Sequence, residues 1–139
     1  MASDEREMMN NALKKVVIPF LRQQGFKGSL PHFRRKNKDN IDLITFQFNR
    51  WDGSFVVELA TSSVEGVTTY WGELVPPNKV TAHDINERFR LGDKSKDEDG
   101  IWFSFENAKS EEDFEEVASY VVDLLKITDR LWIMNLLIE

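Results

Sequence analysis

Residues that commonly perform catalysis or bind metals are sparse in this chain of 139 residues, and their spacing matches no catalytic motif. The two histidines, His32 and His83, are isolated from one another, so the sequence predicts no metal site. The chain has no cysteine, which excludes disulfides and thiolate chemistry. It has no Gly-x-Ser-x-Gly turn for a nucleophilic serine and no glycine signature for phosphates or dinucleotides. We therefore predict no catalytic residue, metal or cofactor.

Two acidic stretches and one pair of glycines resemble functional motifs but have structural explanations. The carboxylates within residues 111–116 suit the positive N-terminal end of a helix, and those within 97–99 suit a solvated loop. Gly25 and Gly28 have the spacing of a nucleic-acid-binding Gly-x-x-Gly loop, but Gly25 also suits the end of a helix. We interpret the pair as a helix ending, because the overall charge of the chain disfavours nucleic acid.

A set of arginine, tryptophan, amide and acidic side chains is the feature most typical of a binding site. Its members are Arg34, Arg35, Gln47, Asn49, Trp51, Glu58, Arg88, Arg90 and Trp102. Arginine and tryptophan are frequent binding anchors, and amides fix the orientation of a ligand. We expect Gln47, Asn49, Trp51 and Glu58 to share one face of a β-sheet. Arg34 or Arg35, together with Arg88 and Arg90, would flank that face if the strands pair as expected. The alternatives are an ordinary solvent-facing surface and a face covered by residues 65–83.

A β-hairpin over residues 41–64 would position most of this set. Asp52-Gly53 is typical of a two-residue type I′ turn, which needs positive φ at both positions, and this turn predicts Phe48 opposite Val57. Because alternate residues of a strand share a face, one face is apolar and must be covered, plausibly by helices. That face holds Ile44, Phe46, Phe48, Phe55, Val57 and Leu59. The opposite, more polar face holds Gln47, Asn49, Trp51 and Glu58.

Helical patterns lie toward both ends of the chain. Residues 3–24 predict a helix that is kinked near Pro19, because proline cannot donate a backbone hydrogen bond. A second helix begins at Ser110, whose hydroxyl can cap it, and residues 128–129 can end it. The apolar tail over residues 131–138 is expected to pack on the body of the protein or on another subunit.

Short strands are predicted between these helices. Residues 30–36 and 101–105 have strand patterns, and residues 84–91 favour a strand over a helical turn because their apolar side chains mostly alternate. Glycines and prolines interrupt residues 65–83, which form either a functional loop or a partly ordered connection. We expect Trp71 to anchor this segment on the body of the protein.

Together these elements predict a single α+β domain over residues 1–139. Its antiparallel sheet has four to five strands, in a meander with a central Asp-Gly hairpin, and the N- and C-terminal helices cover one face. Hydrophobic residues make up 41% of the chain and charged residues 30%, which is ordinary for a globular protein, so a core of normal size can form.

Four fragments of the sequence carry a family resemblance. The first is a helix that ends in Pro-x-Leu and is followed by Gly-Phe-Lys, and the second is a strand with an aromatic residue followed by Arg. The third is a hydrophobic strand with an internal Gln, which has a Phe after its turn. The fourth is an Arg-Leu-Gly stretch that precedes an acidic residue and Trp. The matching residues are Pro19, Leu21, Gly25, Phe26, Lys27, Phe33, Arg34, Arg35, Gln47, Phe55, Arg90, Leu91, Gly92, Asp99 and Trp102. In these fragments the chain resembles the bacterial family catalogued as domain of unknown function 4304 (DUF4304).

The resemblance covers roughly residues 10–125. The chain departs from the family pattern at Ile101, where the family often has a second tryptophan, and at Glu58 and Ala60, where the family tends to have Asn and Gly. The family has no established function, so the resemblance implies no activity, cofactor or partner.

The charge of the chain limits the partners it is expected to bind. Its 18 basic and 24 acidic residues give a net charge of −6, which argues against nucleic acid and is compatible with a basic protein partner. The alternative is that this acidity only maintains solubility. The N-terminus has no apolar signal core and no apolar run could span a bilayer, so we expect a cytoplasmic protein with no membrane partner.

Three functional hypotheses remain open. The first is a non-enzymatic protein–protein interaction module, of which an immunity-like protein that holds a toxin is one form. The second is a small anionic-ligand-binding protein, or an enzyme of unrecognised type, that uses the Arg/Trp/amide face of the sheet. The third is a self-associating subunit that forms a homo-oligomer through the apolar C-terminal tail.

Overall fold

The computed structural model describes residues 4–85, 88–92 and 102–138, and within these the side chains up to residue 128. The helical elements are α1 (Asp4–Ala12), a π-helical turn η1 (Leu13–Val17), α2 (Ile18–Gln23), a 3-10 turn η2 (Ala82–Asp84) and α3 (Glu111–Ile138). The strands are β1 (Lys27–Ser29), β2 (His32–Lys36), β3 (Asn40–Phe48), β4 (Ser54–Ser63), β5 (Val67–Thr68), β6 (Leu74–Val75), β7 (Phe89–Arg90) and β8 (Phe103–Ser104).

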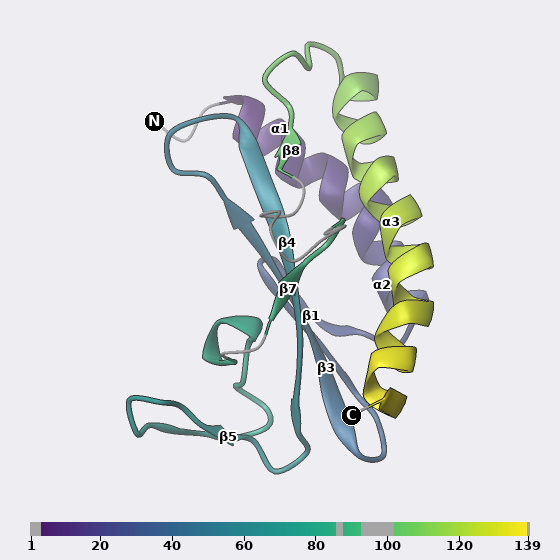
Figure 1. Ribbon diagram of the computed structural model, residues 1–139. Coiled ribbons are helices and arrows are strands. Elements are labelled where there is room, and N and C mark those ends of the chain that lie inside the picture. The colour runs from purple at the N-terminus through teal and green to yellow at the C-terminus, as the bar shows by residue number, and fades with distance from the viewer. Residues whose placement is uncertain (1–3, 86–87, 93–101, 139) are drawn as a thin grey trace.

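An antiparallel sheet forms the centre of the molecule (Figure 1). Its strand order is β1-β2-β3-β4-β7, and β8 also pairs with β4. The consecutive strands β2, β3 and β4 form the predicted meander. Helices α1, α2 and α3 lie together on one side of the sheet, whereas the hairpin of β5 and β6 lies away from them. The predicted α+β fold, with N- and C-terminal helices over one face, is confirmed.

The central hairpin has a different turn from the predicted one. Phe48 pairs with Phe55 rather than Val57, and five residues, Asn49 to Gly53, connect the strands. Neither Asp52 nor Gly53 has positive φ, so the predicted type I′ turn is wrong. The loop is held instead by the side chain of Asn49, whose Oδ1 accepts the Trp51 N–H at 2.7 Å, and by the bond from the Asn49 N–H to the Ser54 carbonyl at 2.8 Å.

The residues of the two strands nevertheless lie on the predicted faces, because the register differs by two residues and two residues restore the same face. Asn49 and Trp51, which were predicted on the polar face, lie in the loop instead. The main core contains five of the six expected side chains, each at most 2% exposed, and Phe48 packs against it partly buried. The ring of Phe55 lies at its centre, with centroids 5.2 to 6.4 Å from those of Phe46, Phe48, Phe103 and Phe105. The helices contribute Met9, Leu13, Val17, Leu21, Phe114, Ala118, Val121 and Leu125 to the same core.

The first helix contains the predicted irregularity. Pro19 has no N–H to donate to the carbonyl four residues earlier, and the turn just before it is π-helical: the Ile18 N–H bonds the Leu13 carbonyl. The helix then ends as expected, with Gly25 at φ +92° and the Phe26 N–H donating to the Leu21 carbonyl at 2.9 Å.

The segment over residues 65–83 is ordered and covers part of the second face of the sheet. Val75, Val80 and Ala82 from this segment pack on Ile41, Leu43 and Ala60 in a second buried cluster. Trp71 is 53% exposed and its indole N–H donates to Glu73, so the expectation that Trp71 anchors the segment is wrong. The three aliphatic residues perform that role.

The strand predicted at 84–91 is much shorter in the structure. Within the described residues of this stretch, β7 is the one strand, and it follows the 3-10 turn η2, which Thr81 and Asp84 cap reciprocally. The strand predicted at 101–105 is reduced to β8, and it places Phe103 opposite Phe55. Residues 86–87, 93–100 and 101 lie outside the described residues.

The last helix begins at the predicted cap and is longer than predicted. The Ser110 hydroxyl accepts the Asp113 N–H at 3.2 Å, and the Asp113 carboxylate accepts the Ser110 N–H at 3.2 Å. Helix α3 continues without a break to Ile138, so the break predicted at residues 128–129 is wrong. The packing expected of the apolar tail falls on side chains outside the described ones.

Candidate functional site

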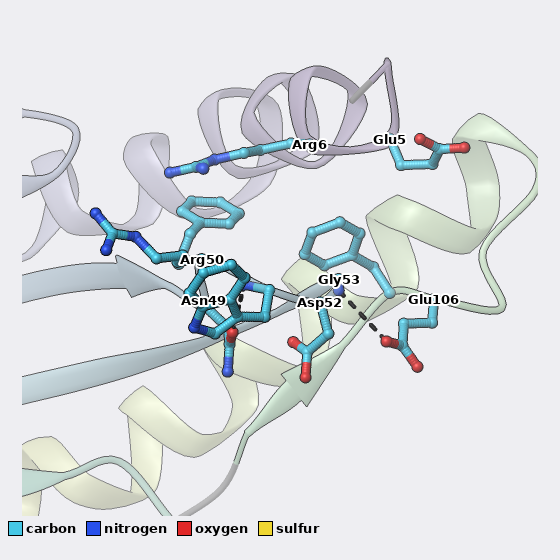
Figure 2. Close-up of a pocket in the computed structure, with 10 residues that line it drawn as sticks. Glu5, Arg6, Asn49, Arg50, Asp52, Gly53 and Glu106 are labelled. Carbon is cyan, nitrogen blue, oxygen red and sulfur yellow. Dashed lines mark hydrogen bonds between the residues drawn. The ribbon is translucent and has the colours of Figure 1, made fainter. Parts of the chain in front are cut away.

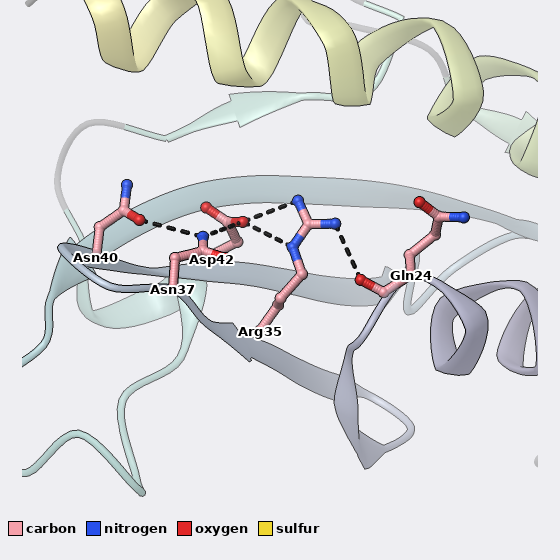
Figure 3. Close-up of polar contacts among 5 residues, drawn as sticks. All are labelled: Gln24, Arg35, Asn37, Asn40 and Asp42. Carbon is pink, nitrogen blue, oxygen red and sulfur yellow. Dashed lines mark hydrogen bonds and ion pairs between the residues drawn. The ribbon is translucent and has the colours of Figure 1, made fainter.

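The structure divides the predicted binding residues among three places instead of gathering them on one face. Arg35 pairs with Asp42, and Asp42 shares a face with the core residues Ile44 and Phe46, because alternate residues of a strand point to the same side. Arg35 therefore lies on the helix-covered side of the sheet. Its guanidinium donates to Asp42 Oδ2 from Nε and from Nη2, both at 2.8 Å, and to the Gln24 carbonyl at 3.2 Å. Asn37 donates to the same carboxylate oxygen at 2.8 Å (Figure 3). Arg35 therefore pairs a buried carboxylate.

A second group lies on the face away from the helices. The Glu58 carboxylate is buried and pairs with the Arg88 guanidinium at 2.7 Å. Arg90 stands opposite Glu58 in the ladder, and its guanidinium carbon lies 5.3 Å from the ring centroid of Trp102. Arg34 donates from Nε to the Val80 carbonyl at 2.5 Å, so it ties β2 to the covering segment. These contacts give Arg34 and Arg88 structural partners on this face.

The two histidines are adjacent on the same face, which their distance in sequence did not indicate. The rings of His32 and His83 meet edge to face with centroids 5.6 Å apart, and His32 Nδ1 lies 2.9 Å from the Thr45 hydroxyl. Burial lowers the pKa of His32, and the nearby charges of His83 and Arg34 lower it further. Among the described residues, no group of three or more His, Asp or Glu side chains is arranged to hold a metal ion.

The third group lies at the end of the central hairpin. Gln47 is exposed, Asn49 holds the loop, and Trp51 projects from it with 87% of its surface exposed. The Arg50 guanidinium carbon lies 5.8 Å from the centroid of a ring of Trp51. An indole this exposed gains no burial energy from the fold, whereas Trp and Arg are the residue types most frequent among interface anchors.

A hollow of about 510 Å³ opens beside Trp51, and we call it the loop hollow. It is lined by Glu5, Arg6, Phe48, Asn49, Arg50, Trp51, Asp52, Gly53, Phe105 and Glu106 (Figure 2). Glu106 accepts the Gly53 N–H at 3.4 Å, and the Arg6 guanidinium carbon lies 4.7 Å from the centroid of the Phe48 ring. The lining therefore combines apolar rings with three carboxylates and two guanidinium groups.

A second hollow of about 650 Å³ continues from the first on the side of β2, and we call it the edge groove. Its lining shares Arg6 and Phe48 with the loop hollow and consists of Arg6, Asn10, Lys14, Ile18, Ser29, Leu30, Pro31, Phe46, Gln47 and Phe48. It thus lies between helices α1 and α2, the turn before β2, and the last residues of β3.

The floor of the edge groove is an unfinished sheet edge. Strand β2 begins opposite Thr45, and just beyond it the Phe46 N–H donates to the Pro31 carbonyl at 2.9 Å. Pro31 has no N–H to return this bond to the Phe46 carbonyl. Because backbone groups of alternate residues point to the same neighbouring strand, the N–H and C=O of Phe48 also point to the β2 side, where no strand of the described residues lies opposite them.

Sequence reasoning missed this edge, although one signal for it was available. Pro31 stood inside the strand predicted at 30–36, and proline within a strand marks an edge or an end of pairing. The loop hollow could not be predicted in this way, because its walls come from α1, the hairpin loop and residues 105–106, which are far apart in the sequence.

Comparison with known proteins places the chain in a family. The sequence model of the family described as Domain of unknown function (DUF4304) matches residues 17–128, so the chain belongs to this family, as the sequence fragments indicated. No curated protein and no solved structure matches the chain. None of the helices in the described part of the chain has both the length and the apolar character needed to cross a bilayer.

Proposed function

We propose that this member of the DUF4304 family is a non-enzymatic protein-interaction module of the cytoplasm, which binds an extended segment of a partner along the edge groove and the loop hollow. The observation that carries the proposal is the unfinished edge of β3 at Phe46 and Phe48, adjacent to the exposed Trp51. A partner segment that adds to such an edge is bound by main-chain hydrogen bonds and selected by its alternate side chains.

The edge offers three backbone groups to an incoming strand. These are the carbonyls of Phe46 and Phe48 and the N–H of Phe48, and each bond to them contributes about 0.5–1.5 kcal/mol net. Proteins usually protect open edges, because they pair with any exposed strand. Here α1 and the turn at Pro31 wall the edge, which favours a narrow extended segment.

Trp51 would act as the anchor at the end of this surface. A tryptophan side chain presents about 150–250 Å² for burial, and truncating such an anchor costs about 2–4 kcal/mol of binding energy. The bond from the Trp51 N–H to Asn49 fixes the backbone of the loop before binding, which lowers the entropy cost of ordering it.

Charge favours a basic partner segment at the loop hollow. The carboxylates of Glu5, Asp52 and Glu106 outnumber the guanidinium groups of Arg6 and Arg50 there, and the net charge of −6 attracts a basic protein at long range. An immunity-like role, in which the partner is a basic toxin, is one form of this proposal.

The alternative function uses the Arg/Trp/amide face to bind a small anion or to perform an unrecognised reaction. This alternative needs guanidinium groups on that face that are free to bind the anion. Arg88 is paired with the buried Glu58, and this contact favours the interaction module.

Selection of peptides from a random library displayed on phage, with the purified protein as bait, tests the proposal directly. We expect selected peptides to contain basic residues and to lose roughly 30-fold in affinity, about 2 kcal/mol, with Trp51→Ala. Trp71→Ala is the matched control, because Trp71 is also exposed but lines neither hollow.

Peptide backbone chemistry separates strand addition from simple side-chain docking. Methylating alternate backbone nitrogens of a selected peptide removes its donors to the Phe46 and Phe48 carbonyls, so affinity should fall for one alternating set and not for the other. Peptides that bind equally well to the Trp51→Ala and Trp71→Ala proteins, or that tolerate every methylation, contradict the proposal.

A further inference from the structure

A third hollow, remote from Trp51, gathers positive charge in this acidic chain. Its volume is about 410 Å³, which is within the range of small-ligand sites. The residues that line it are Gly25, Lys27, Gly28, Arg34, Lys36, Ile41, Pro77 and Asn78. Three of them are cationic and none is acidic, although acidic residues outnumber basic ones in the whole chain by 24 to 18. We call it the cationic hollow.

The strand register explains why three cations meet there. Lys27 of β1 stands directly opposite Arg34 of β2, and residues directly opposite in an antiparallel ladder share a face. Lys36 lies two positions beyond Arg34 on the same strand and therefore projects from the same face. Like charges directly opposite one another destabilise a sheet, so this arrangement opposes folding unless an anion lies between them.

The guanidinium of Arg34 is already oriented. Its Nε donates to the Val80 carbonyl at 2.5 Å, and within the described residues no hydrogen bond engages its two terminal nitrogens. Those nitrogens are the pair that binds the oxygens of a phosphate or carboxylate in parallel. The turn that carries Pro77 and Asn78 forms the opposite wall and is closed by the bond from the Val80 N–H to the Pro76 carbonyl at 3.1 Å.

We propose that the cationic hollow binds a small phosphate-bearing ligand through Lys27, Arg34 and Lys36. A phosphate dianion matches the site better than a single carboxylate, because it has about two negative charges and three acceptor oxygens for three cationic side chains. This site goes beyond the proposed function, since Lys27 and Lys36 line neither the edge groove nor the loop hollow.

Titration of the ¹⁵N-labelled protein with inorganic phosphate and with adenosine monophosphate, at constant ionic strength, tests this proposal by NMR. We expect saturable shifts at the amides of Gly25, Lys27, Gly28, Lys36 and Ile41. The dissociation constant should rise at least about tenfold in the double variant Lys27→Gln/Lys36→Gln and stay unchanged in Lys126→Gln, which removes an exposed lysine on α3. Tighter binding of the nucleotide than of phosphate would mean that the organic part also occupies the hollow.

A thermal unfolding experiment gives a second, independent readout. Without phosphate, Lys27→Gln should melt at a higher temperature than the wild type, because it removes the opposition to Arg34. With saturating phosphate the order should invert, because only the wild type gains the full binding energy. Both lysines are exposed, so neither substitution threatens the core.

Three results would overturn the proposal. The first is a shift pattern that is the same in the double variant as in the wild type. The second is a Lys27→Gln protein that melts below the wild type without phosphate. The third is a single-stranded oligonucleotide that binds through Lys27 and Lys36 more tightly than adenosine monophosphate, since it would assign the lysines to a nucleic-acid surface. Peptide binding at Trp51 should be unaffected in every lysine variant, which separates this test from that of the interaction module.

Discussion

Replacing Arg35 by methionine removes the cation that, among the residues the structure describes, is alone in pairing with the buried Asp42. The Nε and Nη2 groups of Arg35 both donate to Asp42 Oδ2 at 2.8 Å, while Oδ1 is buried without a partner among the described residues. Asp42 is 2% exposed, so Arg35→Met leaves a buried carboxylate whose one remaining bond from a described side chain comes from Asn37. Removing one partner of such a pair costs about 3–5 kcal/mol, a large share of the roughly 5–15 kcal/mol by which domains are stable.

Equilibrium unfolding in urea, followed by tryptophan fluorescence, measures this loss. For a chain of 139 residues, 3–5 kcal/mol corresponds to a fall in Tm of roughly 10–15 °C. The double variant Arg35→Met/Asp42→Leu is the matched control, because replacing both ions by apolar side chains is often neutral or stabilising. It should recover most of the stability with an unchanged dependence on urea. The reasoning fails if Arg35→Met costs less than about 1 kcal/mol, or if the double variant is no more stable than the single one.

Three other substitutions have expected outcomes that urea unfolding can check. Phe55→Ala should lower the free energy of unfolding by about 3–5 kcal/mol, because it empties the centre of the aromatic core. Trp51→Ala should change it by less than about 0.5 kcal/mol, because this side chain is exposed. Similar losses in the two variants would contradict the described burial. Gly66→Ala should destabilise more than Gly72→Ala, although both glycines have positive φ. A Cβ on Gly66 would clash with the Val75 carbonyl oxygen, whereas one on Gly72 would have no atom of the described residues within 4 Å. Equal losses would indicate that φ alone sets the cost. Because the pKa of His32 is lower in the folded protein, the unfolded chain binds a proton to this histidine at a higher pH than the folded protein does. The free energy of unfolding should therefore fall as pH drops below about 6.5 and level off below the folded-state pKa. This dependence on pH should persist in Lys126→Gln and be absent in His32→Gln.

The faces of the central strands were predictable from the sequence, but the turn between them was not. Alternation fixes which side chains are buried whatever the turn, and it also separates Arg34 from Arg35, since neighbours in a strand point to opposite faces. The turn depended on a competition between Asp52-Gly53 and the side chain of Asn49. The hydrogen bond that Asn49 accepts from the Trp51 N–H stabilises the longer loop.

The partners of the candidate site residues could not be predicted, because they come from distant parts of the chain. Val80 binds Arg34 and Arg88 binds Glu58 only once the segment over 65–83 folds back on the sheet. The sequence indicated that a hydrophobic residue anchors that segment. We expected Trp71 because it is the largest side chain, whereas the smaller Val75 and Val80 are the residues that pack on the sheet. The wide indole remains at the tip of the β5–β6 hairpin, and the aliphatic residues fit the shallow second face.

The π-helical turn η1 has a consequence for the spacing of the buried residues around it. Met9, Leu13, Val17 and Leu21 are all buried and recur at intervals of four. In a regular α-helix a four-residue step overshoots a full rotation by about 40°, so three steps would carry the last side chain about 120° away from the first. One additional residue within the wide turn absorbs about 100° of that rotation. Deleting Lys14 would therefore remove that additional residue, and in a regular α-helix the first and last of these side chains would then lie within about 20° of one another, so the line of contact with the sheet would no longer need a π-helical turn.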